Sequence, residues 1–407
     1  MKQRYILHCD IDYCFAQIEI IKNPALASVP MCVGGDETKR HGIVLARNPL
    51  AKAKGVKTAE TLNEARRKCP GLIVVPPAYE DYITISNQVK DIYREYTDKV
   101  ESFGIDEAWV DISDSTMLFG KPGDIATEIR RRVKDEIGLT VSVGMSFNKI
   151  FAKLGSDMEK PDGLTILMES HVRSQIWPLP AKDLLYVGPS TQKSLQKLGI
   201  HTIGDLACAE ESLLHTHLGK MGTILKAFAN GEDDSEVNPY SDPAKSVGNG
   251  MTTPQDLITL DEVRRVLFVL AESVSSRCRE MEKKGSVLRV SMRDHTLETI
   301  SRQKKLIQPT NQVNQLVNES LFLVERYWDQ SKPLRSITIT LSDLVSSSQP
   351  IQLSLFDTPS PVIDETLDQI RERFGFHAIK RASVLVQQDL DTRNPKHQAV
   401  GFGKQPQ

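Results

Sequence analysis

The sequence lacks the patterns of a membrane protein, a secreted protein and a cross-linked protein. No run approaches the ~18 consecutive apolar residues that a membrane span needs, although 40% of the 407 residues are hydrophobic. The first residues, MKQRYILHCD, show no basic segment followed by an apolar stretch and a cleavage site. The six cysteines form no CxxC pair, which argues against a disulfide framework and a structural zinc site. We therefore expect a cytoplasmic protein with reduced thiols.

A large net charge of one sign is also lacking. The formal net charge is −2, so any electrostatic attraction to nucleic acid must come from a local patch. One such patch runs from Lys283 to Lys305, where seven basic residues stand against Asp294 and Glu298. Its basic residues are Lys283, Lys284, Arg289, Arg293, Arg302, Lys304 and Lys305. A DNA-binding surface and an ordinary solvated sheet face explain this patch equally well.

The length and the order of patterns predict an α+β multidomain protein. At about 100–200 residues per domain, three or four domains are expected. Strand-like and helix-like segments mix over residues 1–166 around one sheet, with an insertion at about 16–77 that has small elements of its own. Residues 167–235 are predicted to form short helices, and an acidic stretch rich in Pro, Gly and Ser then predicts a linker. Residues 243–345 show a strand, then the order helix, strand, strand, helix, strand of a small α+β domain.

Four carboxylates lie at predicted strand ends. Asp10 and Asp12 come where the segment RYILHCDID ends, and Asp106 and Glu107 fall at a turn between two short strands. If neighbouring strands bring the two pairs together, cations are needed to balance them. Hard oxygen ligands at this density suit Mg²⁺, and two ions about 3.5–4 Å apart would activate an attacking oxygen and stabilise a leaving one. An acidic pair at a turn is, by itself, more often solvated surface.

The segment LLYVGPSTQKSLQKLGIHTIGDLA predicts two helices joined by a Val-Gly-Pro turn. Such a helix-hairpin-helix points backbone N–H groups and a helix N-terminus at a DNA phosphate. The contact gives affinity without sequence preference. Gly188 and Lys193 are the candidate phosphate contacts of this hairpin.

The motifs DIDYCFAQIE and FGIDEAWVDIS resemble the two catalytic motifs of the Y-family translesion DNA polymerases. The likeness runs through nearly all the chain. VGMSFNKIFAKLGSDMEKPDG resembles the end of their palm, the hairpin resembles their thumb, and the basic α+β domain resembles their little finger. The branch that the chain resembles is that of the bacterial DNA polymerase IV and UmuC-like enzymes. The resemblance implies a template-directed polymerase that adds deoxynucleotides to a primer 3′ end, with low fidelity and no proofreading.

The resemblance also implies the fold of a right-hand polymerase, acting as a monomer. Its parts are expected as a palm at 1–15 and 78–166, fingers at 16–77, a thumb at 167–235, a linker at 236–242, a little finger at 243–345, a clamp-binding segment at 346–360 and a C-terminal extension at 361–407.

Carried over to this sequence, the family's catalytic carboxylates are Asp10, Asp106 and Glu107. We expect them to hold two Mg²⁺ ions, with the backbone carbonyl of Ile11 as a further ligand. Asp12 matches a motif position that is less directly involved. The resemblance further makes Phe15 an aromatic steric gate, because it falls five residues after the first aspartate. A ring at that place leaves no room for a ribose 2′-hydroxyl.

The resemblance also implies contacts to the incoming nucleotide, from Tyr13, Cys14, Phe15, Asn48, Lys52 and Lys160. The family's fingers usually offer a Tyr and an Arg, where this chain has Pro49 and Lys52. Lysine keeps the charge but lacks the bidentate fork, and proline has no hydroxyl. Arg47 or Asn48 could supply the missing contacts, or both could be ordinary loop residues. Cys14, Gly104 and Tyr186 are further departures from the family pattern, and none of them removes a metal ligand.

The remaining expected contacts are with DNA and with a protein partner. The DNA contacts are Gly188, Lys193, Arg289, Arg293, Arg302 and Lys304. The QLSLF sequence resembles the peptide by which bacterial polymerases bind the β sliding clamp, with Gln352, Leu353, Leu355 and Phe356 as its binding residues. A glutamine at a rim and two large apolar groups in a pocket form a short anchor. The alternative is a strand packed on its own domain.

A non-catalytic mutasome subunit that recruits other polymerases through the clamp is the alternative function. Such a scaffold would have no need of all the catalytic carboxylates, and this chain has them. A cyclase built on a related palm would not explain the hairpin, the little finger or the clamp peptide. The lesions bypassed and the need for an accessory mutasome subunit stay open.

Overall fold

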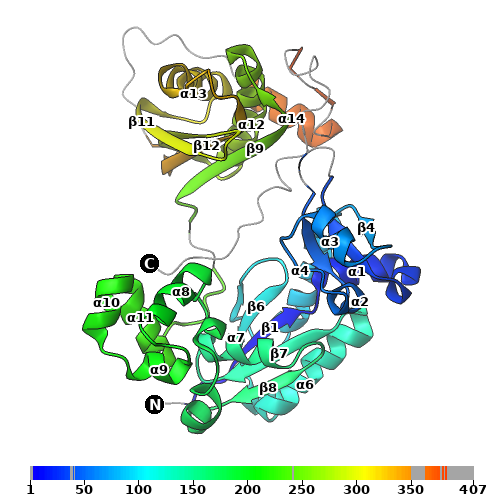
Figure 1. Ribbon diagram of the computed structural model, residues 1–407. Helices are drawn as coiled ribbons and strands as arrows, with labels where there is room; N and C mark the ends of the chain where they lie inside the picture. The colour runs from blue at the N-terminus through cyan, green and yellow to red at the C-terminus, as the bar shows by residue number, and fades with distance from the viewer. Residues whose placement is uncertain are drawn as a thin grey trace. The chain divides into compact units, whose positions relative to one another are not determined.

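The computed structural model describes residues 3–36, 40, 42–240, 243–349, 363–375, 378–379 and 381–382 (Figure 1). They form two compact units, one made of residues 3–34 and 44–240 and the other mainly of residues 243–382. Each unit is described by itself. No helix in the described ranges is both long and apolar enough to cross a membrane.

A five-stranded sheet forms the centre of the first unit, in the order β5-β6-β1-β7-β8. Its strands are β1 (Ile6–Ile11), β5 (Val100–Ser102), β6 (Glu107–Asp111), β7 (Val141–Ser146) and β8 (Leu164–Leu167). β1 lies between β6 and β7 and is antiparallel to both. All its residues are buried, as the apolar run in the sequence predicts for a strand that is covered on both faces.

Helices cover both faces of this sheet (Figure 1). They are α1 (Cys14–Lys22), α4 (Tyr79–Arg94), α6 (Pro122–Arg132) and α7 (Lys149–Met158). Cys9 and Ile11 of β1 share a core with α4 and α6, whereas Ile6 packs with Ala152 of α7. Because side chains alternate along a strand, Asp10 lies on the α7 side of the sheet.

Two glycines let α7 lie close to β7. A Cβ atom on Gly144 of β7 would lie 1.9 Å from the carbonyl oxygen of Ala152, and one on Gly155 would lie 3.2 Å from the Cα of Gly144. A side chain at position 144 would therefore push the helix away from the sheet. Since α7 carries Lys153 and ends shortly before Lys160, this close approach sets the place of both lysines.

The expected insertion has a three-stranded sheet of its own, in the order β3-β2-β4. Its elements are β2 (Met31–Gly34), β3 (Val44–Arg47), α2 (Pro49–Ala53), α3 (Leu62–Lys68) and β4 (Ile73–Val75). They enclose a small core that includes Val44, Val56 and Leu62. α1 contacts β2, β3 and α4, so this helix links the small sheet to the large one.

Residues 167–235 contain short helices that share a core with Phe151 of α7. The helices are α8 (Pro189–Lys197), α9 (Ile203–Cys208), α10 (Glu211–Leu218) and α11 (Lys220–Ala229). The helix expected before the Val-Gly-Pro turn is only the 3₁₀ turn Ala181–Asp183. Tyr186 has a φ of 70°, the left-handed conformation that glycine adopts most easily. Tyr186, which departs from the family pattern, therefore takes a backbone conformation that favours glycine.

A four-stranded antiparallel sheet forms the second unit, in the order β11-β10-β12-β9. Its strands are β9 (Ser246–Leu257), β10 (Lys283–Asp294), β11 (Thr299–Thr310) and β12 (Leu334–Ser346). The helices α12 (Leu260–Glu280) and α13 (Val313–Tyr327) cover one face and bury Leu288, Val290 and Met292 of β10. The element order is the one that the sequence predicts, including the strand before the first helix.

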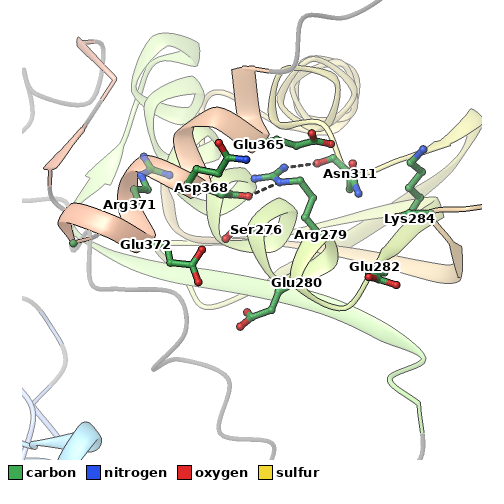
Figure 2. A pocket seen from close by; sticks show the side chains of 13 residues that line it. Ser276, Arg279, Glu280, Glu282, Lys284, Asn311, Glu365, Asp368, Arg371 and Glu372 are labelled. Atoms are coloured by element: carbon green, nitrogen blue, oxygen red, sulfur yellow. Dashed lines mark hydrogen bonds and ion pairs between the residues drawn. The ribbon is translucent and has the colours of Figure 1, made fainter.

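One more helix, α14 (Ile363–Phe374), packs beside α12 through ion pairs. Asp368 Oδ2 accepts from Arg279 Nε at 2.6 Å, and Arg371 Nη2 lies 2.9 Å from Glu272 Oε2. A pocket with many charged side chains, of about 830 Å³, is lined mainly by α14 and by the last turns of α12; Figure 2 shows its lining side chains. Since α14 follows the predicted clamp-binding segment and β12 precedes it, both flanks of that segment are held in the second unit.

Candidate active site

The carboxylates predicted as catalytic meet at one end of the central sheet. Asp10 on β1 is directly opposite Glu107 on β6 in the strand register. Asp106 comes just before this strand, and its carbonyl oxygen accepts the N–H of Ile11 at 2.9 Å. The antiparallel pairing therefore places the two acidic motifs side by side, as their positions at predicted strand ends led us to expect.

These carboxylates line a cavity of about 590 Å³. The rest of its lining comes from the residues after β1, from the small sheet with α2, and from the end of α7. These lining residues are Ile11, Asp12, Tyr13, Cys14, Phe15, Leu45, Ala46, Arg47, Pro49, Lys52, Thr58, Lys153, Asp157, Lys160 and Pro161. The cavity thus joins an acidic end to basic side chains, a combination that suits an anionic ligand bound together with cations.

Two lysines neutralise part of the acidic cluster. Lys160 Nζ lies 2.7 Å from Asp10 Oδ2, and Lys153 Nζ lies 2.8 Å from Glu107 Oε2. Asp157 lies between them, 2.8 Å from Lys160 and 3.7 Å from Lys153. Lys160 is among the residues predicted from the sequence, whereas Lys153 and Asp157 are not; the last turns of α7 present both of these to the cavity.

Burial and repulsion raise the pKa of two of the carboxyl groups. Burial raises the pKa of Asp10 to about 7; Lys160 opposes this shift and the charge of Glu107 increases it. The pKa of Asp106 is raised as well, first by burial and then by Glu107. Burial acts in the same direction on Glu107, but His8 and Lys153 outweigh it and lower the pKa. Cations bound beside Asp10 and Asp106 would therefore stabilise their charged forms.

His8 supports Glu107 from inside the sheet. It is fully buried on β1, with Nε2 3.2 Å from Glu107 Oε2 and Nδ1 2.8 Å from the hydroxyl of Ser156. Burial lowers the pKa of His8 to about 4, so its ring is neutral at pH 7. A polar residue in the middle of a buried strand is the signal by which the sequence could have indicated it.

Lys90 holds the turn that carries Asp106. Its Nζ donates to the carbonyl oxygen of Gly104 at 2.9 Å, and the neighbouring Ser86 hydroxyl donates to the carbonyl of Ile105. Burial lowers the pKa of Lys90, and the charge of Asp106 opposes this shift. Lys90 is not among the residues predicted from the sequence, although a lysine on the buried face of an amphipathic helix is itself an unusual feature.

The carboxylates at this end of the sheet are suitable ligands for divalent cations, although two of them form ion pairs with lysines in this structure. Within the described residues, no three side chains of His, Cys, Asp or Glu are grouped closely enough to form a ready metal site. Asp10 and Glu107 instead bind Lys160 and Lys153. Carboxylates and a backbone carbonyl are the hard oxygen ligands that Mg²⁺ prefers. Both lysines have flexible stems that can move aside when a cation takes their place.

Phe15 forms part of the cavity wall and is held by two tyrosines. Its ring stacks on that of Tyr82 with 4.3 Å between centroids and meets Tyr79 edge-on at 5.9 Å. The hydroxyl of Tyr82 donates to Glu19 Oε1 at 2.7 Å, which fixes the ring behind Phe15. The half-buried Phe15 ring thus has a rigid backing. Tyr13 and Cys14, also predicted as nucleotide contacts, line the same cavity.

The predicted nucleotide contact of Asn48 needs a correction, because its side chain already makes hydrogen bonds within the protein. It is buried; Oδ1 accepts the N–H groups of Ala51 and Met31, and Nδ2 donates to the carbonyl of Val29 at 2.8 Å. An asparagine before a proline is a helix N-cap signal in the sequence itself. Arg47 lines the cavity in its place.

The basic groups at the small sheet are Arg47 and Lys52. Arg47 Nη1 donates to the Thr58 hydroxyl at 2.5 Å, while its buried Nε has no hydrogen-bond partner. Lys52 is exposed on α2, and Pro49 is the first residue of that helix. Both positive charges face the cavity, so the loss of the family's Tyr and Arg does not leave this wall uncharged.

The basic patch of the second unit is divided between two faces of its sheet. Arg289 pairs with Gln303 and Arg293 with Thr299 on the solvent-exposed face. Arg302 and Lys304 pair with Val290 and Leu288, which are buried under the helices. The Arg302 guanidinium accordingly lies over the ring of Tyr327, and Lys304 Nζ lies 2.6 Å from Glu319 Oε2, both on α13. These two residues therefore do not extend the surface of Arg289 and Arg293. Lys305, opposite Val287, does.

The other predicted contacts are placed as follows. Gly188 is the N-cap residue of α8, and Lys193 is exposed on the same helix. Gln352, Leu353, Leu355 and Phe356 lie outside the described residues. The predicted C-terminal extension is described only around α14.

Comparison with known proteins identifies relatives over nearly the whole chain. The profile of the impB/mucB/samB family matches residues 9–157, and that of its C-terminal domain matches residues 244–355. The chain is 44% identical to the DNA polymerase IV of Acetivibrio thermocellus, over 96% of this chain and 99% of that protein. It is 37% identical to the DNA polymerase IV 1 of Bacillus subtilis, over 96% of each.

A solved structure, that of a chimeric Y-family DNA polymerase, has the same fold. It superimposes with a TM-score of 0.75, at 24% sequence identity, over 84% of this chain and 99% of that one. The α+β multidomain fold predicted from the sequence is thus confirmed.

Proposed function

Because the chain belongs to the impB/mucB/samB family of Y-family DNA polymerases, we propose how its own residues carry out the reaction. The enzyme is a DNA-directed DNA polymerase of the translesion type. Its substrates are primer-template DNA and deoxynucleoside triphosphates, and the family's nucleotidyl transfer requires a divalent metal. The observation that carries the proposal is the strand register that sets Asp10 opposite Glu107 in a cavity shared with Phe15 and Lys160.

In this proposal Asp10, Asp106, Glu107 and the carbonyl of Ile11 hold two Mg²⁺ ions. The ions would activate the primer 3′-hydroxyl and stabilise the charge of the leaving pyrophosphate. The protein's own contribution is to fix the ligands: Lys90 holds the turn before Asp106. The first unit then supplies the palm, fingers and thumb at the boundaries expected from the sequence, and residues 243–345 supply the little finger.

Phe15 would act as the steric gate, and three basic side chains would bind the triphosphate. Lys160 reaches the cavity from the end of α7, while Arg47 and Lys52 reach it from the small sheet. Lys160 would leave Asp10, which it contacts at 2.7 Å, when a metal ion and a nucleotide enter. We propose that Arg47, and not Asn48, replaces the family's fingers arginine, because its guanidinium can bind phosphate in a bidentate manner.

Changing Lys52, Arg47 or Lys160 to alanine is expected to raise the KM for the incoming nucleotide. A hydrogen bond to a charged group contributes about 1.5–3 kcal/mol, so each change should raise KM by roughly 10–100-fold. Primer-template affinity should stay nearly intact. Single-nucleotide insertion kinetics and a DNA-binding assay measure the two quantities.

Lys54→Ala is the matched control for Lys52→Ala. Lys54 is an exposed lysine two positions further along, and it does not line the cavity. Its KM should match that of the unmodified enzyme. If one of the three cavity variants instead weakened DNA binding and left KM unchanged, that residue would belong to the DNA-binding surface.

DNA would be bound through its phosphates at two surfaces. One is the N-terminus of α8, where Gly188 is the cap and Lys193 adds a charge. The other is the open face of the four-stranded sheet, with Arg289, Arg293 and Lys305. Such contacts make the affinity salt-dependent and largely independent of sequence.

We further propose that QLSLF binds the β sliding clamp. Leu355 and Phe356 would fill a pocket, each contributing about 1–3 kcal/mol. Changing both to alanine should leave primer extension without clamp unchanged but remove most of the gain when clamp is loaded, since tethering acts through effective concentration. The measurement is product length with and without loaded clamp.

Ser354→Ala, inside the same peptide, is the matched control and should respond to the clamp normally. Loss of extension without clamp by the double variant would mean that the segment is part of the folded core. A full response to the clamp would place the binding site elsewhere. The related alternative, a non-catalytic subunit that recruits other polymerases, requires that the purified chain extend no primer, with or without clamp.

A further inference from the structure

Both carboxylate oxygens of Asp12 accept hydrogen bonds from neutral donors of the protein. The residue is 2% exposed. Its Oδ1 accepts the hydroxyl of Ser142 at 2.7 Å, and its Oδ2 accepts the hydroxyl of Thr140 at 2.8 Å. The backbone N–H of Asp162 donates to the same Oδ2 at 2.8 Å. Both oxygens are therefore engaged, which leaves Asp12 poorly suited to be a metal ligand.

The bond to Asp162 links Asp12 to the loop that carries Lys160. This loop follows α7, and Asp162 adopts a φ of 55° in it, a conformation that a non-glycine residue needs surrounding contacts to maintain. On the outer side, Arg130 Nη2 lies 2.9 Å from Asp162 Oδ1 and Lys134 Nζ lies 2.9 Å from Oδ2. Asp12 is the contact on the side of β1.

The strand side of Asp12 is equally fixed. Its own N–H donates to the carbonyl of Thr140 at 3.1 Å. Gln17 Nε2 donates to the carbonyl oxygen of Asp12 at 3.0 Å, and Gln17 Oε1 accepts the N–H of Thr140 at 2.6 Å. A carboxylate held in this way is a rigid support, and it stands two residues after Asp10.

We propose that Asp12 is a positioning residue for nucleotide binding: through the Asp162 amide it fixes the loop that directs Lys160 toward the triphosphate. It thereby holds the phosphate-binding lysine at a set distance from the strand that carries Asp10. The proposal rests on the function proposed above for Lys160. It gives the second aspartate of the DID motif a role that involves neither a metal ion nor the reacting atoms.

Two substitutions of Asp12 separate shape from charge. Asp12→Asn removes the charge but keeps an oxygen that can accept the Asp162 N–H, and the Ser142 hydroxyl can accept from its amide. Asp12→Ala removes the acceptor. The alanine variant should raise KM for the nucleotide about tenfold or more, as loss of a buried hydrogen-bond partner implies, with kcat changed much less. The asparagine variant should keep a KM close to that of the unmodified enzyme.

A double-mutant cycle tests whether Asp12 acts through Lys160. In a Lys160→Ala background the Asp12→Ala change should have almost no further effect on KM, because the group that it positions is gone. The affinity of the nucleotide for the complex of enzyme and DNA can be measured directly with a dideoxy-terminated primer, which cannot be extended. It should fall in Asp12→Ala, and it should fall no further when Asp12→Ala is added to Lys160→Ala. Asp12→Ser, too short to reach the Asp162 amide, replaces the alanine variant in the cycle if thermal unfolding shows that the alanine variant does not fold.

The outcomes distinguish this inference from the proposed function. If Lys160→Ala leaves KM unchanged, the phosphate-binding role of Lys160 falls, and the inference falls with it. If Lys160→Ala raises KM but the effect of Asp12→Ala is absent or simply adds to it, only the inference is overturned. A loss of kcat in Asp12→Asn as large as in Asp12→Ala would show that Asp12 acts through its charge on the metal site, which also overturns it.

Discussion

Asp106→Ala and Glu107→Ala are each expected to lower the rate of nucleotide addition by about a thousandfold or more, since metal ions contribute several kcal/mol to the transition state. Both side chains line the cavity at the end of the central sheet, where Glu107 is directly opposite Asp10. Removing either one removes a proposed metal ligand, so the loss should fall on the chemical step. Binding of primer-template DNA should persist, because the proposed phosphate contacts lie on other elements. Single-turnover extension and DNA-binding assays measure the two effects.

Asp114→Asn is the control for a lost carboxylate in the same unit. It forms an exposed ion pair with Lys99 at 3.1 Å, and its rate should be unchanged. A direct metal-binding measurement with Mn²⁺ adds a readout that is independent of turnover, and both cavity variants should bind Mn²⁺ more weakly. Near-normal extension by either cavity variant would contradict the two-metal assignment.

Phe15→Ala is expected to raise the incorporation of ribonucleotides by roughly 10²–10³-fold relative to deoxynucleotides, since removing a clash of about 3–4 kcal/mol changes a rate by tenfold for each ~1.4 kcal/mol. The ring stacks on Tyr82, whose hydroxyl is bound to Glu19. If Phe15 is the gate, as proposed, this backing would keep a 2′-hydroxyl from displacing the ring. The ratio of kcat/KM for a deoxynucleotide and its ribonucleotide measures the effect.

Tyr82, which packs behind the Phe15 ring, allows a second test of this prediction. Tyr82→Ala keeps the Phe15 ring but removes its support, so its discrimination should fall between that of the unmodified enzyme and that of Phe15→Ala. Phe119→Ala, a 44% exposed ring in the same unit that does not line the cavity, should discriminate normally. Unchanged preference in Phe15→Ala would mean that another residue excludes the ribose.

Much of this enzyme follows from short stretches of sequence. The β1 run ILHCDI predicts a buried strand that carries Asp10 next to its last residue, and the pattern of residues 243–345 gives the order of strands and helices observed in the second unit. Local signals also explain one error. Asn48 stands before Pro49 at a helix start, and its N-cap geometry uses the side chain that the family resemblance assigns to the nucleotide.

Short stretches of sequence do not show how the basic residues of β10 and β11 are divided between the two faces of the sheet. Alternation along a strand predicts that Arg289 and Arg293 share a face, as do Arg302 and Lys304. In β10 the apolar Leu288, Val290 and Met292 indicate the covered face, but β11 has no such alternation around Arg302 and Lys304, so their face depends on the pairing with β10. A shift of one residue exchanges the two faces of a strand, and the sequence does not reveal the register.

The sequence by itself determined where the proposed chemistry lies: the carboxylates, the aromatic ring and the lysine that we propose for the reaction stand in short motifs whose residue types and order are local properties of the chain. Only the tertiary structure decided which groups support them. Lys90, Lys153, His8 and Asp12 act across strands and helices that are distant in sequence. Their roles arise because burial in a shared core forces each polar group to find a partner through space, and that partner is fixed by packing rather than by neighbours along the chain.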